Sequence, residues 1–508
     1  MSLLDDVSIV VTPNGYKAGE LYAVVPVPTE GTDLVTNGDF SNWTGDNPDN
    51  FLVLNENAAN YVTESSNQLR MVSDNSATIA IRPQPTSMLT VGKIYKVSVD
   101  LTFTTGSIDI SGNSFNSSGT KVFYINAGTT YLQIAKTSAL DVLIDNVSVK
   151  EVTRDNVPRI DYTGGGCPYI LAEPQRKNLI PYSEDFSSNW TTSNLSVVEH
   201  STTSPSGETN ADKLKEDSSN SAHKIRYASP NTPVTNGAVY TMSFFAKKEE
   251  RTSIRISNAA MSNTDGKFNL SNGQVISSGS SATNSMVDYG NGWYRCIMTF
   301  TSTSTIAQAN ISILNANNDI TYQGDGSSGL YMWGVQIEAG SYATSYIPNF
   351  GTSSGVTRAQ DLFTRDGIGS LINSTEGVLF VELENIVDSA APIAMLGLTD
   401  GSASNRISIF ISGGQLSAES AGSGTNLGIF SKSLSTGFNK IAIKYKVNDC
   451  ALWINGDEYN DTSFAAFSVN TLNTLSFDKG DGTMDFYGKV KQLQVYKTAD
   501  IDLAALTS

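Results

Sequence analysis

The chain has 508 residues and a formal net charge of −17, with 39% hydrophobic and only 16% charged residues. At about 100–200 residues per domain this length suggests roughly three domains, and the many Ser, Thr, Asn and Gly residues favour β-structure with frequent turns over helical bundles. The acidic balance excludes the basic face that nucleic-acid binding requires, and it disfavours binding to anionic membrane surfaces.

Cysteine and histidine are too few to build a disulfide framework or a zinc site. The three cysteines Cys167, Cys296 and Cys450 are far apart and odd in number. The two histidines, His200 and His223, leave little material for a zinc site or a catalytic triad. Stability must therefore come from packing.

The N-terminus reads MSLLDDVSIVV, which lacks both the basic and the long apolar region of a secretory signal. No apolar run reaches the roughly 18 residues that a transmembrane helix needs. The composition is nevertheless that of an extracellular β-protein. We therefore expect another route out of the cell, such as assembly onto a virus particle that is released by lysis.

Residues 1–33 contain two strongly strand-forming phrases, VSIVV and LYAVV. The segment is too short to bury a core of its own. Strands of this kind are stable only when their unpaired edge is covered, and a partner chain can cover it by adding a strand. We therefore predict that 1–33 is an anchor or assembly segment.

The phrase LVTNGDFSNW at 34–43 has a second copy, NLIPYSEDFSSNW, at 178–190. Each copy is followed, at almost the same distance, by a Gly three residues before a Tyr: VGKIYKVSVDL and NGAVYTMSFFA. We predict that one β-module is used twice, at 34–152 and 178–350. Trp43 should then be equivalent to Trp190, and Tyr95 to Tyr240.

The later half of the second copy is longer and holds further strand-like runs around NGQVISS and NGWYRCIMTFTS. Asn-Gly pairs, such as Asn236-Gly237 and Asn272-Gly273, supply the positive φ angles of tight hairpins. Short strands at this spacing predict a sandwich or jelly roll.

Two stretches differ in composition from the modules. RIDYTGGGCPYILAEPQRK at 159–177 is rich in Gly and Pro, and IPNFGTSSGVTRAQD at 347–361 is rich in Gly and Ser. Both are typical of joints between domains. We predict linkers at 153–177 and 351–370.

A third module is predicted at 371–508. GVLFVELE alternates apolar and polar residues from Val378. KIAIKYKV at 440–447 places aliphatic and aromatic side chains on one face and lysines on the other, as in a half-buried strand. We expect another antiparallel sandwich, closed by DFYGKVKQLQVYKTAD and followed by a short helical tail.

These phrases resemble those of bacteriophage structural proteins. LVTNGDFSNW, VGKIYKVSVDL and IDNVSVKEV resemble a carbohydrate-binding type of β-sandwich, and VPRIDYTGGGCPYILAEPQRK with WGVQIEAGSYATSYIPNFG resembles the flanks of a second such module in fibre and tail proteins. NKIAIKYKVNDCALWINGDEY resembles a concanavalin A-like, laminin G-like domain. The expected fold class is all-β: tandem antiparallel β-sandwiches, two jelly-roll-like modules plus a concanavalin A-like sandwich.

The resemblance implies a structural surface protein of a bacteriophage virion, a head or tail fibre or decoration, that attaches to host-surface or environmental glycans such as those of mucus. Its partners would be other virion proteins, bound through residues 1–33, and it would form a homo-oligomer, a trimer or alternatively a dimer. It would be assembled in the bacterial cytoplasm and would end on the virion surface. Two alternatives stay open: a polysaccharide depolymerase on the virion, and a spacer that binds nothing.

Aromatic rings are the first candidates for carbohydrate binding, because a flat apolar ring can pack against a sugar. Trp43, Trp190, Trp293 and Trp333 are predicted to lie in cores. Trp453 precedes the tight turn Asn455-Gly456 and is the candidate carbohydrate-binding residue.

The loop DKGDGTMD is the candidate metal site, with Asp478, Asp481 and Asp485 as oxygen ligands for calcium. Their spacing does not match an EF-hand, and the competing interpretation is a solvated acidic turn. No other cofactor is expected.

Glu382 and Glu384 lie two residues apart on one predicted strand, so both carboxylates share a face. Paired carboxylates are what glycosidases use, but a polar sheet face is the favoured interpretation. The sequence shows no Ser-His-Asp set, HExxH motif or phosphate-binding loop. We therefore predict no catalytic residue and no enzyme activity.

Overall fold

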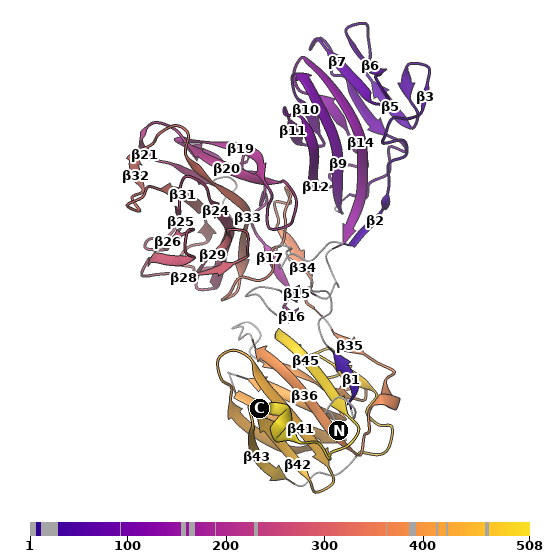
Figure 1. Ribbon diagram of the computed structural model, residues 1–508, viewed down its shortest axis with the longest axis vertical. Coiled ribbons are helices and arrows are strands. Elements are labelled where there is room, and N and C mark those ends of the chain that lie inside the picture. The colour runs from indigo at the N-terminus through magenta and orange to yellow at the C-terminus, as the bar shows by residue number, and fades with distance from the viewer. Residues whose placement is uncertain are drawn as a thin grey trace.

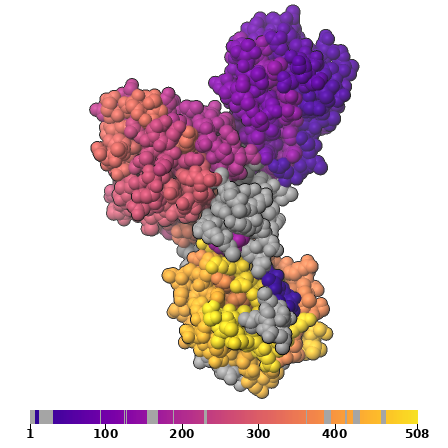
Figure 2. All heavy atoms as spheres, viewed as in Figure 1, coloured from indigo at the N-terminus to yellow at the C-terminus, as the bar shows by residue number. Residues whose placement is uncertain are grey.

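The computed structural model describes residues 7–11, 29–91, 93–153, 159–161, 168–187, 189–227, 232–361, 363–385, 393–412, 415–422, 425–462 and 467–508. Figures 1 and 2 show three lobes: the first module in indigo, the second in magenta to salmon and a C-terminal sandwich in orange to yellow. Within these residues the helical elements are α1 (Leu503–Thr507) and the short 3-10 turn η2 (Gly369–Leu371). The all-β prediction is confirmed.

The first module is a sandwich of two antiparallel sheets. One sheet has the order β12-β9-β14-β7-β6, with β2 beside β14, and the other has the order β11-β10-β13-β8-β5. Tyr95, Val97, Val99 and Leu101 alternate along β9 and are all buried between the sheets. The strands are β2 (Thr29–Asp33), β5 (Phe51–Leu54), β6 (Asn60–Glu64), β7 (Leu69–Ser73), β8 (Ala80–Pro83), β9 (Ile94–Thr105), β10 (Ile108–Ile110), β11 (Asn113–Phe115), β12 (Gly119–Asn126), β13 (Ile134–Lys136) and β14 (Leu140–Thr153), with the small hairpin β3 (Trp43–Thr44) and β4 (Asn47–Pro48).

The second module is also a two-sheet sandwich, with the orders β19-β20-β33-β24-β29-β28 and β18-β22-β31-β25-β26-β27. These strands are β18 (Thr191–Ser193), β19 (Leu195–Thr202), β20 (Ala211–Glu216), β22 (Lys224–Arg226), β24 (Val239–Lys248), β25 (Ser253–Asn258), β26 (Asp265–Asn269), β27 (Gln274–Ser278), β28 (Thr283–Asp288), β29 (Trp293–Thr301), β31 (Ala309–Leu314) and β33 (Gly329–Ala339). Short pairs join β21 (Asn220–Ala222) to β32 (Thr321–Gln323) and β23 (Thr232–Pro233) to β30 (Ile306–Ala307).

The two modules have the same topology. The sheet β12-β9-β14-β7-β6 corresponds strand for strand, in chain order, to β29-β24-β33-β20-β19, and β11-β10-β13-β8-β5 corresponds to β26-β25-β31-β22-β18. The second module adds β27 and β28, one strand at an edge of each sheet. NGQVISS therefore belongs to the insertion, but NGWYRCIMTFTS forms β29, the counterpart of β12. Our prediction that this second run was extra is wrong.

Matching hydrogen bonds support the predicted equivalence of Tyr95 and Tyr240. The hydroxyl of Tyr95 accepts a hydrogen bond from the backbone N–H of Thr90 at 2.8 Å, and that of Tyr240 accepts one from Thr235 at 2.9 Å. Both rings are buried. Each tyrosine thus ties the preceding turn to the start of a central strand.

The repeated Asp-Phe-Ser phrase also folds alike, but the two tryptophans differ. Asp39 and Asp185 each accept hydrogen bonds from the backbone and hydroxyl of the serine two residues on. Trp190 is 5% exposed, whereas Trp43 is only partly buried at the edge of its core. Trp190 donates to the carbonyl of Tyr182, and Trp43 donates to a carbonyl within its own turn.

The C-terminal sandwich recruits strands from three parts of the chain. One sheet has the order β15-β16-β45-β36-β41-β42-β43, with β1 also paired to β45, and the other has the order β35-β44-β37-β38-β39-β40. The strands are β1 (Val7–Val11), β15 (Arg159–Asp161), β16 (Tyr169–Ala172), β35 (Thr364–Arg365), β36 (Glu376–Asn385), β37 (Ile393–Thr399), β38 (Arg406–Ser412), β39 (Gln415–Gly422), β40 (Thr425–Ser433), β41 (Asn439–Lys446), β42 (Cys450–Ile454), β43 (Asp457–Thr462), β44 (Thr474–Ser476) and β45 (Gly488–Tyr496).

Strand β1 pairs along one edge with the chain's own strand β45. Val11 pairs with Leu493 and Val7 with Tyr496, and the hydroxyl of Ser8 donates to the carbonyl of Leu371 at 2.7 Å. Figure 1 shows β1 beside β45 in the C-terminal lobe. The chain's own strand β45 therefore covers one edge of VSIVV, and the role of residues 1–33 as an anchor or assembly segment stays a prediction. The second phrase, LYAVV, lies outside the described residues.

Both predicted linkers contain paired strands. Within 153–177, β15 and β16 extend the C-terminal sheet, and β17 (Arg176–Asn178) pairs with β34 (Val356–Arg358). Within 351–370, β35 pairs with β44. The predicted linkers therefore hold short strands as well, which Gly- and Pro-rich composition conceals because the partners of these strands are distant in sequence.

Buried charges join the second module to the C-terminal sandwich. Glu173 and Arg358 form an ion pair at 3.0 Å, with side chains 4% and 5% exposed. The backbone N–H of Glu173 donates to Asp361 at 2.7 Å, and Arg358 donates to the carbonyl of Pro174 at 2.9 Å. Leu171 of β16 also packs in a cluster with second-module aromatic residues, including Trp333. Both contacts oppose independent movement of the two parts.

Candidate functional site

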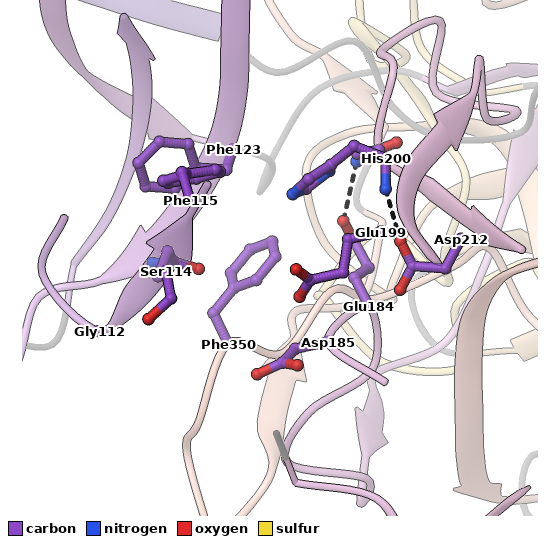
Figure 3. Close-up of a pocket in the computed structure, with 12 residues that line it drawn as sticks. Gly112, Ser114, Phe115, Phe123, Glu184, Asp185, Glu199, His200, Asp212 and Phe350 are labelled. Carbon is purple, nitrogen blue, oxygen red and sulfur yellow. Dashed lines mark hydrogen bonds between the residues drawn. The ribbon is translucent and has the colours of Figure 1, made fainter. Parts of the chain in front are cut away.

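A pocket lies where the first and second modules meet (Figure 3). We call it the inter-module pocket. The first module contributes the β10–β11 turn and β12, and the second contributes the turn before β18, strands β19 and β20, and Phe350 after β33. Its lining includes aromatic and ionisable side chains: Phe115, Phe350, Glu184, Asp185, Glu199 and His200.

Aromatic rings form the first-module wall. Phe115 ends β11 and lies 5.0 Å from Phe123 of β12, ring centre to ring centre. The His200 ring stacks on Phe115 at 5.7 Å with an interplanar angle of 25°. Because the stacked rings come from different modules, the pocket exists only where the two modules are in contact.

An irregularity in β19 positions His200. The pairing of β19 with β20 shifts register between Val198 and Thr202, and His200 has a φ of +50°. Its backbone N–H donates to Asp212 at 2.9 Å, one of the dashed lines in Figure 3. A positive φ is uncommon in a residue other than glycine, and here it accompanies the contact of His200 with Phe115.

Carboxylates form the second-module wall. Figure 3 shows Glu184, Asp185, Glu199 and Asp212 on one side of the pocket, with the Phe350 ring between them and the first module. Glu184 accepts hydrogen bonds from the Tyr346 hydroxyl and from Asn210, both at 3.0 Å.

Asp185 and Asn210 complete this wall in different ways. Asp185 accepts a hydrogen bond from the side chain of Asn189 at 3.0 Å, which fixes its carboxylate. The Oδ1 atom of Asn210 is buried and makes no hydrogen bond within the described part of the chain.

Burial and charge set the protonation states. Burial raises the pKa of Asp212 well above its usual range, and the nearby carboxylates, Glu199 first among them, add to this. Burial lowers the pKa of His200 to about 4, with a further contribution from the Lys121 ammonium. Burial also lowers the pKa of Lys121, against the attraction of Glu199. At neutral pH the histidine is therefore neutral, and a lining with four carboxyl groups and no charged base disfavours anionic ligands.

The enclosed part of the pocket is small, with a volume of about 60 Å³. Since one water takes about 30 Å³, this space admits an edge of a sugar ring and not the whole ring. No group of three or more His, Cys, Asp or Glu side chains that could hold a metal occurs among the described residues. The acidic wall is thus not assembled as a metal site.

Trp453, the residue predicted for carbohydrate binding, lies on β42. It is partly buried and packs against a cluster that contains Leu503 and Leu506 of α1, together with Val7 of β1. The terminal helix therefore covers part of the Trp453 ring. Less of the ring is available to a sugar than its position before a tight turn suggested.

The three aspartates predicted to bind calcium are each used in local hydrogen bonds. Asp478 accepts from the backbone N–H of Gly480, and Asp481 accepts from Thr483. Asp485 accepts from the side chain of Gln360 at 3.1 Å. Among the described residues, no three His, Cys, Asp or Glu side chains are grouped so that they could hold a metal ion, and calcium binding stays a prediction.

Glu382 and Glu384 lie on the outer face of β36 beside lysines of β45. Glu382 contacts Lys491 at 3.1 Å, and Glu384 contacts Lys489 at 3.2 Å. Each carboxylate is partly buried, with a lysine counter-charge.

Sequence reasoning missed the inter-module pocket, because its residues come from two modules and only the fold brings them together. One signal was available: the second copy of the repeated phrase carries Glu184 directly before Asp185, where the first copy has Gly38 before Asp39. A second carboxylate added next to a repeated turn marks a difference in chemistry between the two copies.

No protein-family model and no curated protein matches the sequence. One solved structure with some similarity is that of the tandem CBM22 domains at the N-terminus of Xyn10C from Paenibacillus barcinonensis. It is 13% identical to this chain, the match covers 64% of this chain and 100% of that one, and the TM-score is 0.19. The LG1-3 region of the laminin α2 chain is 9% identical over 96% of this chain and 95% of that one, with a TM-score of 0.21. Sialidase from Trypanosoma rangeli in complex with sialic acid is 8% identical over 88% and 82%, also with a TM-score of 0.21. TM-scores this low carry no argument about function.

Proposed function

We propose that the chain is a structural surface protein of a bacteriophage virion, a head or tail fibre or decoration, that adheres to host-surface or environmental glycans. The phrases that resemble phage fibre and tail proteins support the virion location. The tandem sandwiches, with a buried ion pair between the second module and the C-terminal sandwich, suit a protein that holds binding sites away from a particle. Among the described residues no helix is long and apolar enough to cross a membrane.

The inter-module pocket carries the glycan-binding part of the proposal. The half-buried ring of Phe350 offers apolar surface to the C–H face of a sugar, and the carboxylates of Glu184, Asp185 and Glu199 accept hydrogen bonds from its hydroxyls. The buried Phe115 ring supports this surface by holding His200 in place. A few polar groups beside apolar surface is the usual composition of a small-ligand site. Because the lining is acidic, the expected ligands are neutral sugars.

Each such contact is shallow, so a single site would bind weakly. Several copies on one particle would engage several sugars at once, and the linked sites would act at a high effective concentration. Attachment of the particle can then be strong although each pocket is weak.

A polar sheet face accounts for Glu382 and Glu384 better than catalysis does. Each carboxylate contacts a lysine of the neighbouring strand β45, as expected of charged side chains on the outer face of a sheet. The depolymerase alternative would show itself as release of reducing sugar from host capsule or exopolysaccharide. The spacer alternative predicts no binding to any sugar.

A glycan array tests the proposal. The wild-type chain should bind neutral oligosaccharides, and Phe115→Ala and Glu199→Gln should each lose most of the signal. Glu384→Gln removes a carboxylate elsewhere and serves as the matched control, so its binding should be unchanged. A wild-type chain that binds no glycan would favour the spacer alternative. Equal binding by all variants would show that glycans do not bind in the inter-module pocket.

Location on the particle needs a separate observation. Electron micrographs of intact virions labelled with an antibody against this chain should show it projecting from the head or the tail. Its absence from purified particles would contradict the virion part of the proposal while leaving glycan binding open.

A further inference from the structure

A cavity of about 700 Å³ lies at the base of the second module, where β24 begins and β33 ends. We call it the basal cavity. Its volume falls within the roughly 300–1,000 Å³ that small-molecule sites occupy. Most of its wall is aliphatic, with Leu179, Val234, Ala238, Val239 and Ala339 among the lining residues.

The first module carries different residues at the equivalent place. Tyr95 pairs with Glu151 in one module, and Tyr240 pairs with Ala339 in the other, so Glu151 and Ala339 are equivalent. Two residues before each tyrosine stand Lys93 and Ala238.

In the first module these positions hold an ion pair. Lys93 and Glu151 meet at 2.7 Å, and their long side chains join the start of β9 to the end of β14. The second module has Ala238 and Ala339 there, and both line the basal cavity. Replacement of a charged pair by two small apolar residues thus coincides with an open apolar site.

The charge at the rim is reversed as well. In the first module Glu30, on the strand that enters the sandwich, pairs with Lys150 of the last strand at 3.1 Å. In the second module the corresponding pair is Arg176 with Glu338, at 3.9 Å. The cation now lies on the entering strand, where it lines the cavity, and Glu338 is fully buried behind it.

Two cationic side chains line the cavity, and none of its described lining residues is acidic. The Arg176 guanidinium packs on Gly340, whose φ is +135° and whose added Cβ would lie 2.9 Å from an Arg176 nitrogen. Lys177 is partly buried, packs over Gly355 and forms no salt bridge with a residue in the described ranges. In a chain of net charge −17, a basic rim on an apolar hollow is a local exception.

We propose that the basal cavity binds a carboxylate carried on an aliphatic body. The carboxylate would lie at Lys177 and Arg176, since charge-assisted hydrogen bonds are the strong ones. The aliphatic body would cover Leu179, Val234 and Val239, where removal of apolar surface from water supplies the affinity. This site goes beyond the glycan role and does not depend on it.

Titration calorimetry with octanoate tests the proposal on the full chain. The wild type should bind octanoate, and octylammonium, which has the same chain but the opposite charge, should not bind. Lys177→Glu replaces attraction by repulsion and should weaken binding by at least about tenfold, which corresponds to about 1.4 kcal/mol.

A pair of substitutions places the first-module residues in the basal cavity. Ala238→Lys with Ala339→Glu restores the Lys93–Glu151 pair without changing the net charge, and it should abolish octanoate binding. Lys248→Gln, at the far end of β24, removes a surface charge and should leave binding unchanged. Thermal melts confirm that each variant folds.

Two sources of an aliphatic carboxylate can be separated. Binding of octanoate alone would indicate a fatty acid. Binding of acetyl-Gly-Gly-Leu as the free acid, but not as the amide, would indicate the C-terminus of a partner chain. Either result supports the proposal. It is overturned if neither probe binds the wild type, or if the Ala238→Lys, Ala339→Glu variant binds them as well as the wild type does.

Discussion

At the residue scale, His200 connects the two modules, and its pKa depends on their contact. Its ring stacks on Phe115, and Lys121 of the first module helps to lower its pKa to about 4. If the modules separate, the ring returns to water and its pKa returns toward the ordinary value of about 6.5. The contact between the modules should therefore depend on pH.

The direction of this pH dependence follows from how many protons each state binds. Between about pH 6.5 and pH 4 the separated state binds more protons than the closed state, so the contact is fully present above pH 6.5 and weakens as the pH falls. Burial raises the pKa of Asp212, and the carboxylates that add to this all belong to the second module. Small-angle scattering should show expansion at pH 5 relative to pH 7.5.

His200→Gln is the matched control for this prediction, because glutamine keeps a polar side chain and does not titrate in this range. The variant should show the same scattering curve at both pH values. Equal expansion in the variant and the wild type would assign the effect to other groups, and no expansion in the wild type would contradict the contact itself.

A second residue-scale prediction tests the equivalence of the modules. Tyr95→Phe and Tyr240→Phe each remove a hydroxyl that accepts from a backbone N–H, a loss of about 1 kcal/mol. Hydrogen exchange should become a few-fold to tenfold faster at Thr90 and Thr235, by a similar factor in both.

Tyr131→Phe is the control for the tyrosine pair, because the Tyr131 ring packs under Arg82 and its hydroxyl makes no hydrogen bond to a described residue. Exchange at Thr90 and Thr235 should not change in this variant. A strong effect at one tyrosine and none at the other would contradict the shared role.

At the element scale, β1 completes the C-terminal sandwich from the opposite end of the chain. Ile9 packs against the sandwich core, whereas the neighbouring Val10 is 48% exposed. Ile9→Asp places a carboxylate against apolar neighbours and should lower the unfolding free energy of this sandwich by about 2–4 kcal/mol. Val10→Asp should have little effect. Calorimetric unfolding measures both, and equal effects would contradict the pairing of β1 with β45.

The ion pair between Glu173 and Arg358 makes a second element-scale prediction. Arg358→Met leaves Glu173 buried without its cation and should cost about 3–5 kcal/mol. Arg70→Met breaks the pair with Asp141 on the surface of the first module and should cost at most about 1 kcal/mol. Limited proteolysis should then cut between 173 and 178 in Arg358→Met only. Resistance equal to that of the wild type would show that the junction does not depend on the pair.

At the scale of the whole molecule, local sequence patterns predicted the features that depend on neighbouring residues, such as strands and turns. Alternation in β9 and β41 and the Asn-Gly turns predicted the all-β class, and the repeated phrase predicted two modules with one topology. The pairing of β1 with β45 and of β16 with the same strand could not be predicted, because these contacts join segments hundreds of residues apart and no periodicity records them. Gly- and Pro-rich composition concealed β15 and β16 for the same reason.

The candidate site was harder to predict than the fold. Trp453 and the aspartate loop were chosen for residue type, but tertiary packing decides whether such groups are available, and α1 packs against Trp453. The inter-module pocket depends on how two modules meet, which is a property of neither sequence repeat by itself. The basal cavity could have been found from the sequence, since Lys93 against Ala238 is visible once the two copies are aligned.

If the contact between the first two modules forms a glycan site, a sugar must lie there. A crystal structure of the full chain soaked with the strongest neutral oligosaccharide from the array shows this. We expect a sugar edge in the inter-module pocket, with its C–H face toward Phe350 and a hydroxyl within hydrogen-bond distance of Glu199 or Asp185. A sugar bound instead at Trp453, or at a single module away from the contact, would contradict it.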